Sequence, residues 1–365
     1  MNHYRLGLIG IAMLITPIVY LPRFFIEARF TGAIPAIILA AMTGSLISIW
    51  FLHSMKQSRG LTVLEVIKKQ VPSYLGWPLH VCMSITGYVG GALVLITMSS
   101  VTMRFINPTM DIHVLLLCFL LAGGWSALRS SRALMFGMEY WILLCVPLLF
   151  FLWFKSVSNT MFDWDAVLML TDYVKITPSW QLIFVGSFIF TGFISFYVFK
   201  EAAKWQASIH EAWMIPLAGV IVFCGFFFIP FGVHGTQAVE HYNYIWMNTA
   251  DSIQLKHGMI ERGVFIYLAV YMIISLLFIS ISWYSAAAWL MNGVLASAAY
   301  SPKKTRRIQQ LVVVVMAVVA FAGGHYMNEQ QLFLFTKYWF FARFIVDVIL
   351  VWIVGSAVKR SKLSL

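Results

Sequence analysis

Ten apolar segments, each near the length that crosses a lipid bilayer, dominate this chain of 365 residues. A transmembrane helix needs about 20 mostly apolar residues. The composition agrees, because 61% apolar and 11% charged residues leave too little polar surface for a protein in water. The sequence therefore predicts an all-α membrane protein with ten transmembrane helices, at residues 6–21, 33–52, 79–103, 112–128, 138–154, 181–199, 213–231, 263–291, 308–322 and 338–358.

The distribution of Lys and Arg predicts how the chain crosses the membrane. With the N-terminus inside, 16 of the 25 basic residues lie on the inner side, 8 lie on the outer side, and Arg343 lies within the last segment. Because basic residues favour the cytoplasmic side, we expect both termini in the cytoplasm. The net charge of +11 then belongs to the inner face, where it favours anchoring to anionic lipid over binding to nucleic acid.

Signals for other classes of protein are weak. The first segment runs into Tyr20-Leu21-Pro22 instead of a small-residue cleavage site, so we interpret it as an uncleaved spanning helix. The four cysteines lie inside apolar segments without paired spacing, and we expect no disulfide. The nine histidines show no ligand spacing, and no catalytic motif is present. We expect no enzyme activity, no cofactor and no metal.

Two of the apolar segments contain residues that interrupt a helix. Pro17 cannot donate a backbone hydrogen bond and disfavours helical geometry at Thr16, so it releases carbonyls inside the membrane. Thr191 and Gly192 permit a second break, in segment six. Transporters with inverted repeats keep their substrate site at such a pair of broken helices, where a helix end suits an anionic group. The alternatives are a simple proline kink and a glycine that allows close helix packing.

The segments are predicted to form one domain with two five-helix inverted repeats, about residues 1–178 and 179–365, with helices one and six broken. The longest connection, residues 232–262, contains three carboxylates and several aromatic residues. It is interpreted as a lid over an outer vestibule, or equally as a loop whose aromatic residues lie at headgroup depth.

Several short motifs carry a resemblance to a known family. The chain resembles the B subunits of spore germinant receptors, the endospore germination permease family of the amino-acid, polyamine and organocation superfamily, at Leu21-Pro22-Arg23, Thr86-Gly87-Tyr88, Phe190-Thr191-Gly192 and Ile260-Glu261-Arg262. The resemblance extends over nearly the whole chain in length, segment count and loop sizes. It implies a ten-helix permease-like bundle in the inner spore membrane that recognises a small nutrient, an amino acid, beside an A subunit and a lipoprotein C subunit.

The resemblance also implies a set of ligand-binding residues. They lie on the unwound stretches of segments one and six and on the pocket sides of segments three and eight: Thr16, Pro17, Tyr88, Thr191, Gly192, Phe278 and Ser282. The chain departs from the family pattern twice. Ile15-Thr16-Pro17 replaces a glycine-rich turn, and Ile194 stands where an acidic residue often follows the glycine of segment six.

Residues for ion coupling are sparse. Segments one, three, six and eight contain no intramembrane carboxylate, and segment five contains no lysine, so a proton relay is not expected. Arg343 and Asp347 are spaced i, i+4 in segment ten and are expected to form a pair, with a structural role or a gating role.

Three functional hypotheses remain open from the sequence. The first is a nutrient-sensing subunit of a germinant receptor that triggers germination, and the second is an amino-acid transporter of the same superfamily. The third is a purely structural membrane subunit. The predicted pocket is apolar and rich in hydroxyl groups, which favours a small neutral amino acid as the ligand over a charged one.

Overall fold

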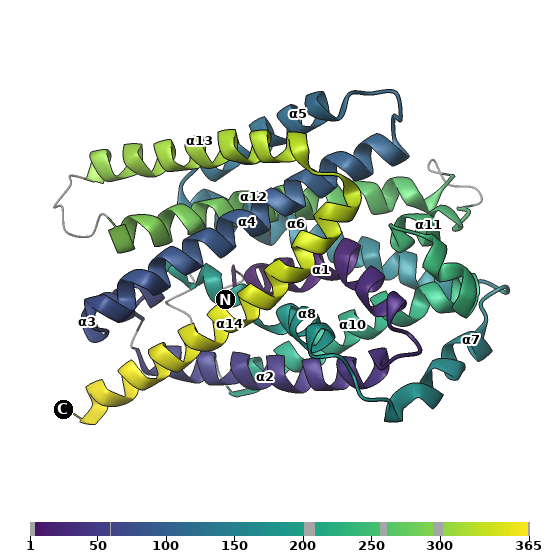
Figure 1. The fold of residues 1–365 in the computed structure, drawn as a ribbon, viewed down its shortest axis with the longest axis horizontal. Helices are drawn as coiled ribbons and strands as arrows, with labels where there is room; N and C mark the ends of the chain where they lie inside the picture. Colours follow the sequence, from purple (N-terminus) through teal and green to yellow (C-terminus); the bar gives the residue numbers. More distant parts are fainter. Residues whose placement is uncertain (1–3, 59, 201–208, 256–260, 295–301, 364–365) are drawn as a thin grey trace.

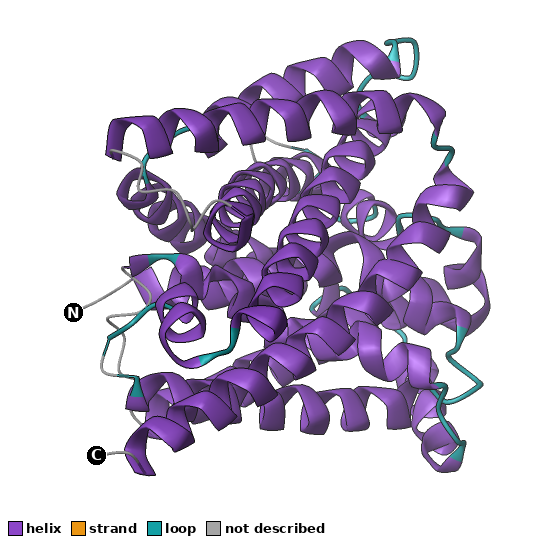
Figure 2. Cartoon of the chain, turned by 60° about the vertical axis from the view of Figure 1, so that its left-hand side comes forward, coloured by secondary structure: helices purple, strands orange, loops and turns teal. Residues whose placement is uncertain are grey.

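The computed structural model describes residues 4–58, 60–200, 209–255, 261–294 and 302–363. These parts of the chain are built from helices connected by short loops (Figure 2). The elements are α1 (Tyr4–Glu27), α2 (Ala33–Gln57), α3 (Val63–Gln70), α4 (Ser73–Phe105), α5 (Ile112–Ala127), α6 (Ser131–Val157), α7 (Trp164–Met169), η1 (Leu170–Lys175), α8 (Trp180–Thr191), η2 (Gly192–Val198), α10 (Ile209–Ala238), η3 (Val239–His241), α11 (Ile245–Asp251), α12 (Gly263–Val294), α13 (Pro302–Tyr326) and α14 (Glu329–Leu363).

All ten predicted segments are helical. Among the described residues, nine helical spans are long and apolar enough to cross a membrane, and α5 is a shorter apolar helix at the tenth position. Most helices extend several residues beyond the predicted bounds, because polar and aromatic residues continue them past the apolar run. The chain is an all-α integral membrane protein. The division into two inverted halves and the orientation of the termini stay predictions.

The described helices form a core and a periphery. In the most apolar stretches of α1 and of α8 with η2, 83% and 89% of the residues are buried, against 22% for α13. Figure 1 shows α4 and α12 running side by side, with α13 and α5 outside them and α11 and α7 at the right-hand end. The helices that the sequence predicts to be broken therefore lie inside the bundle, whereas α13 presents most of its surface to lipid.

Small residues let α4 and α12 approach closely. A side chain at Gly91 of α4 would lie 2.6 Å from Nε1 of Trp283, which is fully buried on α12. That indole nitrogen donates a hydrogen bond to the carbonyl of Tyr88, at 3.3 Å. Nearby, the Ser84 hydroxyl donates to the carbonyl of Ala286, at 2.8 Å. The hydrophobic effect does not drive helices together within lipid, so close packing and interhelical hydrogen bonds stabilise this contact instead.

The connection after α10 closes the right-hand end of the bundle in Figure 1. Trp246 of α11 is buried and donates from Nε1 to the carbonyl of Phe226, at 2.8 Å. Tyr244 is buried too. These aromatic residues are therefore covered by protein, because α11 packs against α12, α1 and α10. Their depth in the membrane stays a prediction.

Polar contacts fasten this connection to α1 and α14. Arg29 pairs with Glu240, and Arg23 donates to Asn243. Asn243 Nδ2 in turn donates to Glu329 Oε2 at the start of α14, at 3.2 Å. The connection therefore joins the ends of α1 and α14, and its role as a lid stays a prediction.

Candidate functional site

Helix one remains helical through its prolines. The structure assigns α1 as one helix from Tyr4 to Glu27, with Pro17 and Pro22 inside it. The expected unwound stretch at Thr16 and Pro17 is therefore wrong. Proline has a backbone φ that suits a helix and costs it only the local hydrogen bond and some steric strain. Pro22 leaves the Ile18 carbonyl without its partner four residues later, and the buried hydroxyl of Tyr267 donates to that carbonyl, at 2.8 Å.

Helix six does break at the predicted position. The α-helix α8 ends at Thr191, and the chain continues from Gly192 to Val198 as the tighter 3₁₀ helix η2. Carbonyls beside the break accept hydrogen bonds from other helices. The Ser48 hydroxyl donates to the Phe190 carbonyl at 2.6 Å, and Trp289 Nε1 donates to the Ser195 carbonyl at 3.3 Å. Neighbouring side chains thus satisfy groups that lipid would leave unpaired.

A buried ion pair touches the break. Arg343 Nη2 lies 2.8 Å from Asp347 Oδ1, and Arg343 Nε donates to Oδ2 at 3.1 Å, which confirms the predicted pair. Their side chains are 2% and 0% exposed. The Thr191 hydroxyl donates to Asp347 Oδ2 at 3.3 Å, and Arg343 Nη1 donates to Thr86 Oγ1 at 3.4 Å. The pair therefore links α14 to the last residue of α8 and to α4.

A small cavity lies between α1, α4, α8, α12 and α14. Its volume is about 10 Å³, roughly the space that one water molecule requires. The lining is apolar and aromatic with three hydroxyl groups, from Ile15, Thr16, Tyr20, Gly90, Leu93, Val94, Phe188, Phe278, Thr336, Trp339 and Phe340. The Phe188 ring packs edge-on against Trp339 and Phe340, with centroids 5.3 and 5.5 Å away. Aromatic rings thus fill the centre of the bundle.

Two of the predicted ligand-binding residues line this cavity. Thr16 faces it from α1, and Phe278 faces it from α12. Pro17 is the next residue in the buried core of α1. Gly192 does not line the cavity, but its lack of a side chain leaves room for the Phe188 ring, which does. A side chain at this position would lie 2.9 Å from that ring and 3.2 Å from Ala12.

The other three predicted residues lie away from the lining. Tyr88 is half-buried, with its ring centroid 6.3 Å from that of Trp283. Thr191 is bonded to the ion pair, and Ser282 is buried against Gly91 of α4. Ligand contact by each of the seven stays a prediction.

Several residues that line the cavity are not among the seven predicted ligand-binding residues. Thr336, Trp339 and Phe340 lie on one face of α14, where the spacing i, i+3, i+4 is the available signal. Tyr20 lies one turn after Thr16, and its hydroxyl donates to the Leu93 carbonyl at 3.0 Å. Nothing in an apolar sequence distinguishes such residues from ordinary helix packing.

At the end of the bundle near α11, burial raises the pKa of Tyr244 far above its ordinary value, and the Glu329 carboxylate raises it further. The hydroxyl is therefore neutral throughout the physiological range. Arg104 contacts the same carboxylate, at 3.4 Å. This cluster joins α4 and α14 to the residue that precedes α11.

Comparison with known proteins identifies the fold of this chain but not a family to which it belongs. No family model matches the sequence, and no curated protein matches it. The solved structures with a similar fold include two with TM-scores of 0.59 and 0.58 and sequence identities of 12% and 13%. One is a Na⁺-coupled sialic acid symporter in its substrate-bound outward-open state, aligned over 88% of this chain and 72% of its own. The other is MhsT in complex with L-phenylalanine, aligned over 97% and 88%. The chain shares the fold of these transporters.

Proposed function

We propose that this protein is a membrane receptor subunit that senses a small neutral amino acid in the central cavity. The observation that carries the proposal is the cavity lining, where apolar and hydroxyl groups meet beside the break in helix six. One similar structure binds L-phenylalanine and the other is a sialic acid symporter, so the fold is compatible with a small ligand. The resemblance to germinant receptor B subunits supports a role in spore germination, with A and C subunits as partners.

The buried charges favour sensing over ion-coupled transport. Among the residues whose side chains the structure describes, Asp347 is the only buried carboxylate, and Arg343 neutralises it. The carbonyls of Phe190 and Ser195 already accept hydrogen bonds. A coupling cation needs a free carboxylate or free carbonyls in the membrane, and the Asp347 carboxylate and these two carbonyls already have partners.

The closed cavity suggests how binding would be signalled. A ligand larger than a water molecule has to displace Phe188, which lies one turn before the break and packs on Trp339 of α14. Displacement moves α8 relative to α14, and the contact of Thr191 with Asp347 lies between those helices. A ligand that favours the open arrangement shifts the population toward it, and partner subunits convert that shift into a response.

Equilibrium binding to the purified full chain tests the cavity. Neutral amino acids, sugars and nucleosides are titrated into wild type, Phe278→Trp and Phe265→Trp. Both phenylalanines lie on α12, but Phe278 is 3% exposed at the cavity, whereas Phe265 is 53% exposed. We expect saturable binding that Phe278→Trp abolishes and Phe265→Trp preserves. Equal binding by the two variants would remove the cavity from the proposal.

The similar fold favours a second candidate, amino-acid transport. Reconstituted vesicles with and without a sodium gradient separate the two. Saturable uptake of the ligand that binds the cavity would make the protein a transporter, while binding without uptake leaves the sensor. Co-purification of a tagged chain with candidate A and C subunits tests the partner proposal separately.

A further inference from the structure

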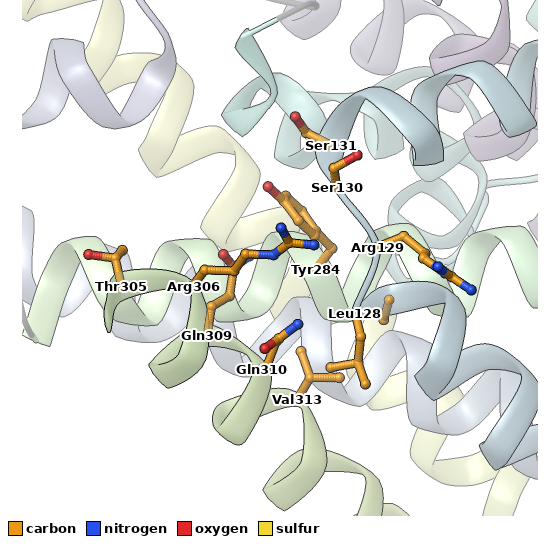
Figure 3. Close-up of a pocket in the computed structure, with 11 residues that line it drawn as sticks. Leu128, Arg129, Ser130, Ser131, Tyr284, Thr305, Arg306, Gln309, Gln310 and Val313 are labelled. Carbon is orange, nitrogen blue, oxygen red and sulfur yellow. The ribbon is translucent and has the colours of Figure 1, made fainter. Parts of the chain in front are cut away.

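A second, larger cavity lies at the end of the bundle where α5 ends and where α6 and α13 begin. Its volume is about 460 Å³, and Figure 3 shows the side chains that line it. Arg129 and Arg306 contribute two positive charges, and no carboxylate belongs to the described lining. Ser130 and Ser131 add hydroxyl groups. In Figure 3, the guanidinium of Arg306 is directed toward Tyr284, while that of Arg129, on the opposite side of the cavity, points away from Arg306.

The positive character of this cavity has a second source. Ser130 caps α6, where its hydroxyl accepts a hydrogen bond from the Ala133 amide at 3.4 Å. The start of a helix of 27 residues carries a partial positive charge. Arg129 lies over the ring of Trp125 at 5.2 Å, which holds its guanidinium beside the last turn of α5. These groups together suit a phosphate.

An apolar groove lies next to the same cavity. It has a volume of about 360 Å³ and lies between α5 and α13. Leu128 and Val313 line both the groove and the polar cavity, so the two spaces are adjacent. The groove is open to lipid, because Leu121 and Val318 along it are 60% and 64% exposed. A polar, positively charged cavity thus adjoins an apolar groove along two transmembrane helices.

We propose that this composite surface binds an anionic glycerophospholipid. The phosphate lies in the polar cavity that Arg129 and Arg306 line, and an acyl chain lies in the groove between α5 and α13. A free anion would use the polar cavity alone, and a neutral lipid would use the groove alone. Only a molecule with both parts matches the charge and the apolar surface, and basic pockets between transmembrane helices suit such headgroups.

The site also contacts the core of the bundle. Tyr284 lines the polar cavity, and its ring stacks on that of Phe199, with centroids 5.1 Å apart and planes 14° from parallel. Phe199 is buried and directly follows η2. A bound headgroup is therefore one aromatic contact away from the broken helix.

Native mass spectrometry of the delipidated full chain tests the proposal. Phosphatidylglycerol and phosphatidylcholine are titrated into wild type, into Arg129→Gln/Arg306→Gln, and into the control Arg132→Gln/Arg307→Gln. The control removes the same charge from the neighbouring positions, which are exposed and outside the cavity. We expect wild type and control to prefer phosphatidylglycerol, and the Arg129/Arg306 variant to bind it at least tenfold more weakly.

A groove variant and a soluble competitor distinguish a lipid from a free anion. A side chain at Gly124 meets nothing within 4 Å and enters the groove, so Gly124→Leu is expected to weaken phosphatidylglycerol binding without affecting glycerol 3-phosphate. Equal binding of phosphatidylglycerol by the two double variants would overturn the proposal. So would equal binding of phosphatidylcholine, or competition by glycerol 3-phosphate at the lipid's own concentration.

Discussion

Replacing Asp347 with asparagine is expected to leave an uncompensated cation in the centre of the bundle. The Arg343 side chain is 2% exposed, and its contacts at 2.8 and 3.1 Å are with the carboxylate that the change neutralises. Removing one partner of a buried pair costs about 3–5 kcal/mol. At about 1.4 kcal/mol for each factor of ten, the ratio of folded to unfolded protein falls by two to three and a half powers of ten.

The double variant Arg343→Met/Asp347→Leu separates the charge from the packing. Apolar side chains of similar volume remove the cation together with its partner, and such replacements of buried pairs are often neutral or stabilising. We therefore expect the double variant to recover most of the lost stability. Thr191 loses its acceptor in this variant, a cost of about 1 kcal/mol, so recovery is expected to be incomplete.

The assay is reversible unfolding in mixed detergent micelles, followed by tryptophan fluorescence. Arg262→Gln is the matched control, because Arg262 and Asp251 form a pair at 3.0 Å whose side chains are 59% and 37% exposed. Exposed pairs contribute about 0–1 kcal/mol, so the control should unfold almost as wild type does. A loss below about 1 kcal/mol for Asp347→Asn, or a double variant no better than the single one, would refute the reasoning.

Two further changes test contacts of helix one and helix six. Tyr267→Phe removes the hydroxyl that donates to the Ile18 carbonyl and is expected to cost about 1–3 kcal/mol in the same unfolding assay; an unchanged midpoint would contradict it. Gly192→Ala pushes a methyl group against Phe188 and is expected to change ligand affinity at the cavity. Gly137→Ala, whose side chain meets nothing within 4 Å, should leave binding unchanged; equal binding by both alanine variants would contradict the role of Gly192.

The sequence predicts the helices well and the central cavity poorly, for physical reasons. Apolar run length is a direct consequence of bilayer thickness, so all ten segments are helical where expected. The i, i+4 spacing of Arg343 and Asp347 brings their side chains together on any helix, and the pair is present. Both predictions depend on residues close together in the chain, and such local rules need no knowledge of the bundle.

Helix one shows where local rules fail. Pro17 predicts a break because its missing N–H leaves a carbonyl unpaired, yet α1 continues through it. Whether a proline kinks, breaks or fits a helix depends on the donors that other helices bring. At Pro22 that donor is Tyr267, 245 residues further along the chain. For the same reason, Phe188 and Trp339 became recognisable as cavity residues only when α8 and α14 were placed beside each other.

The closed bundle constrains how any ligand can act. Side chains of α2 and α12 already satisfy carbonyls beside the break in helix six, and rings of α8 and α14 already fill the cavity. A ligand therefore binds only to an arrangement in which those rings have moved, and its apparent affinity is reduced by the fraction of molecules that adopt that arrangement. Changes that loosen the contact between Phe188 and Trp339 should then raise affinity without touching the ligand. Ligand binding then follows a hyperbolic curve whose midpoint lies at a higher ligand concentration than the intrinsic affinity of the open arrangement would give.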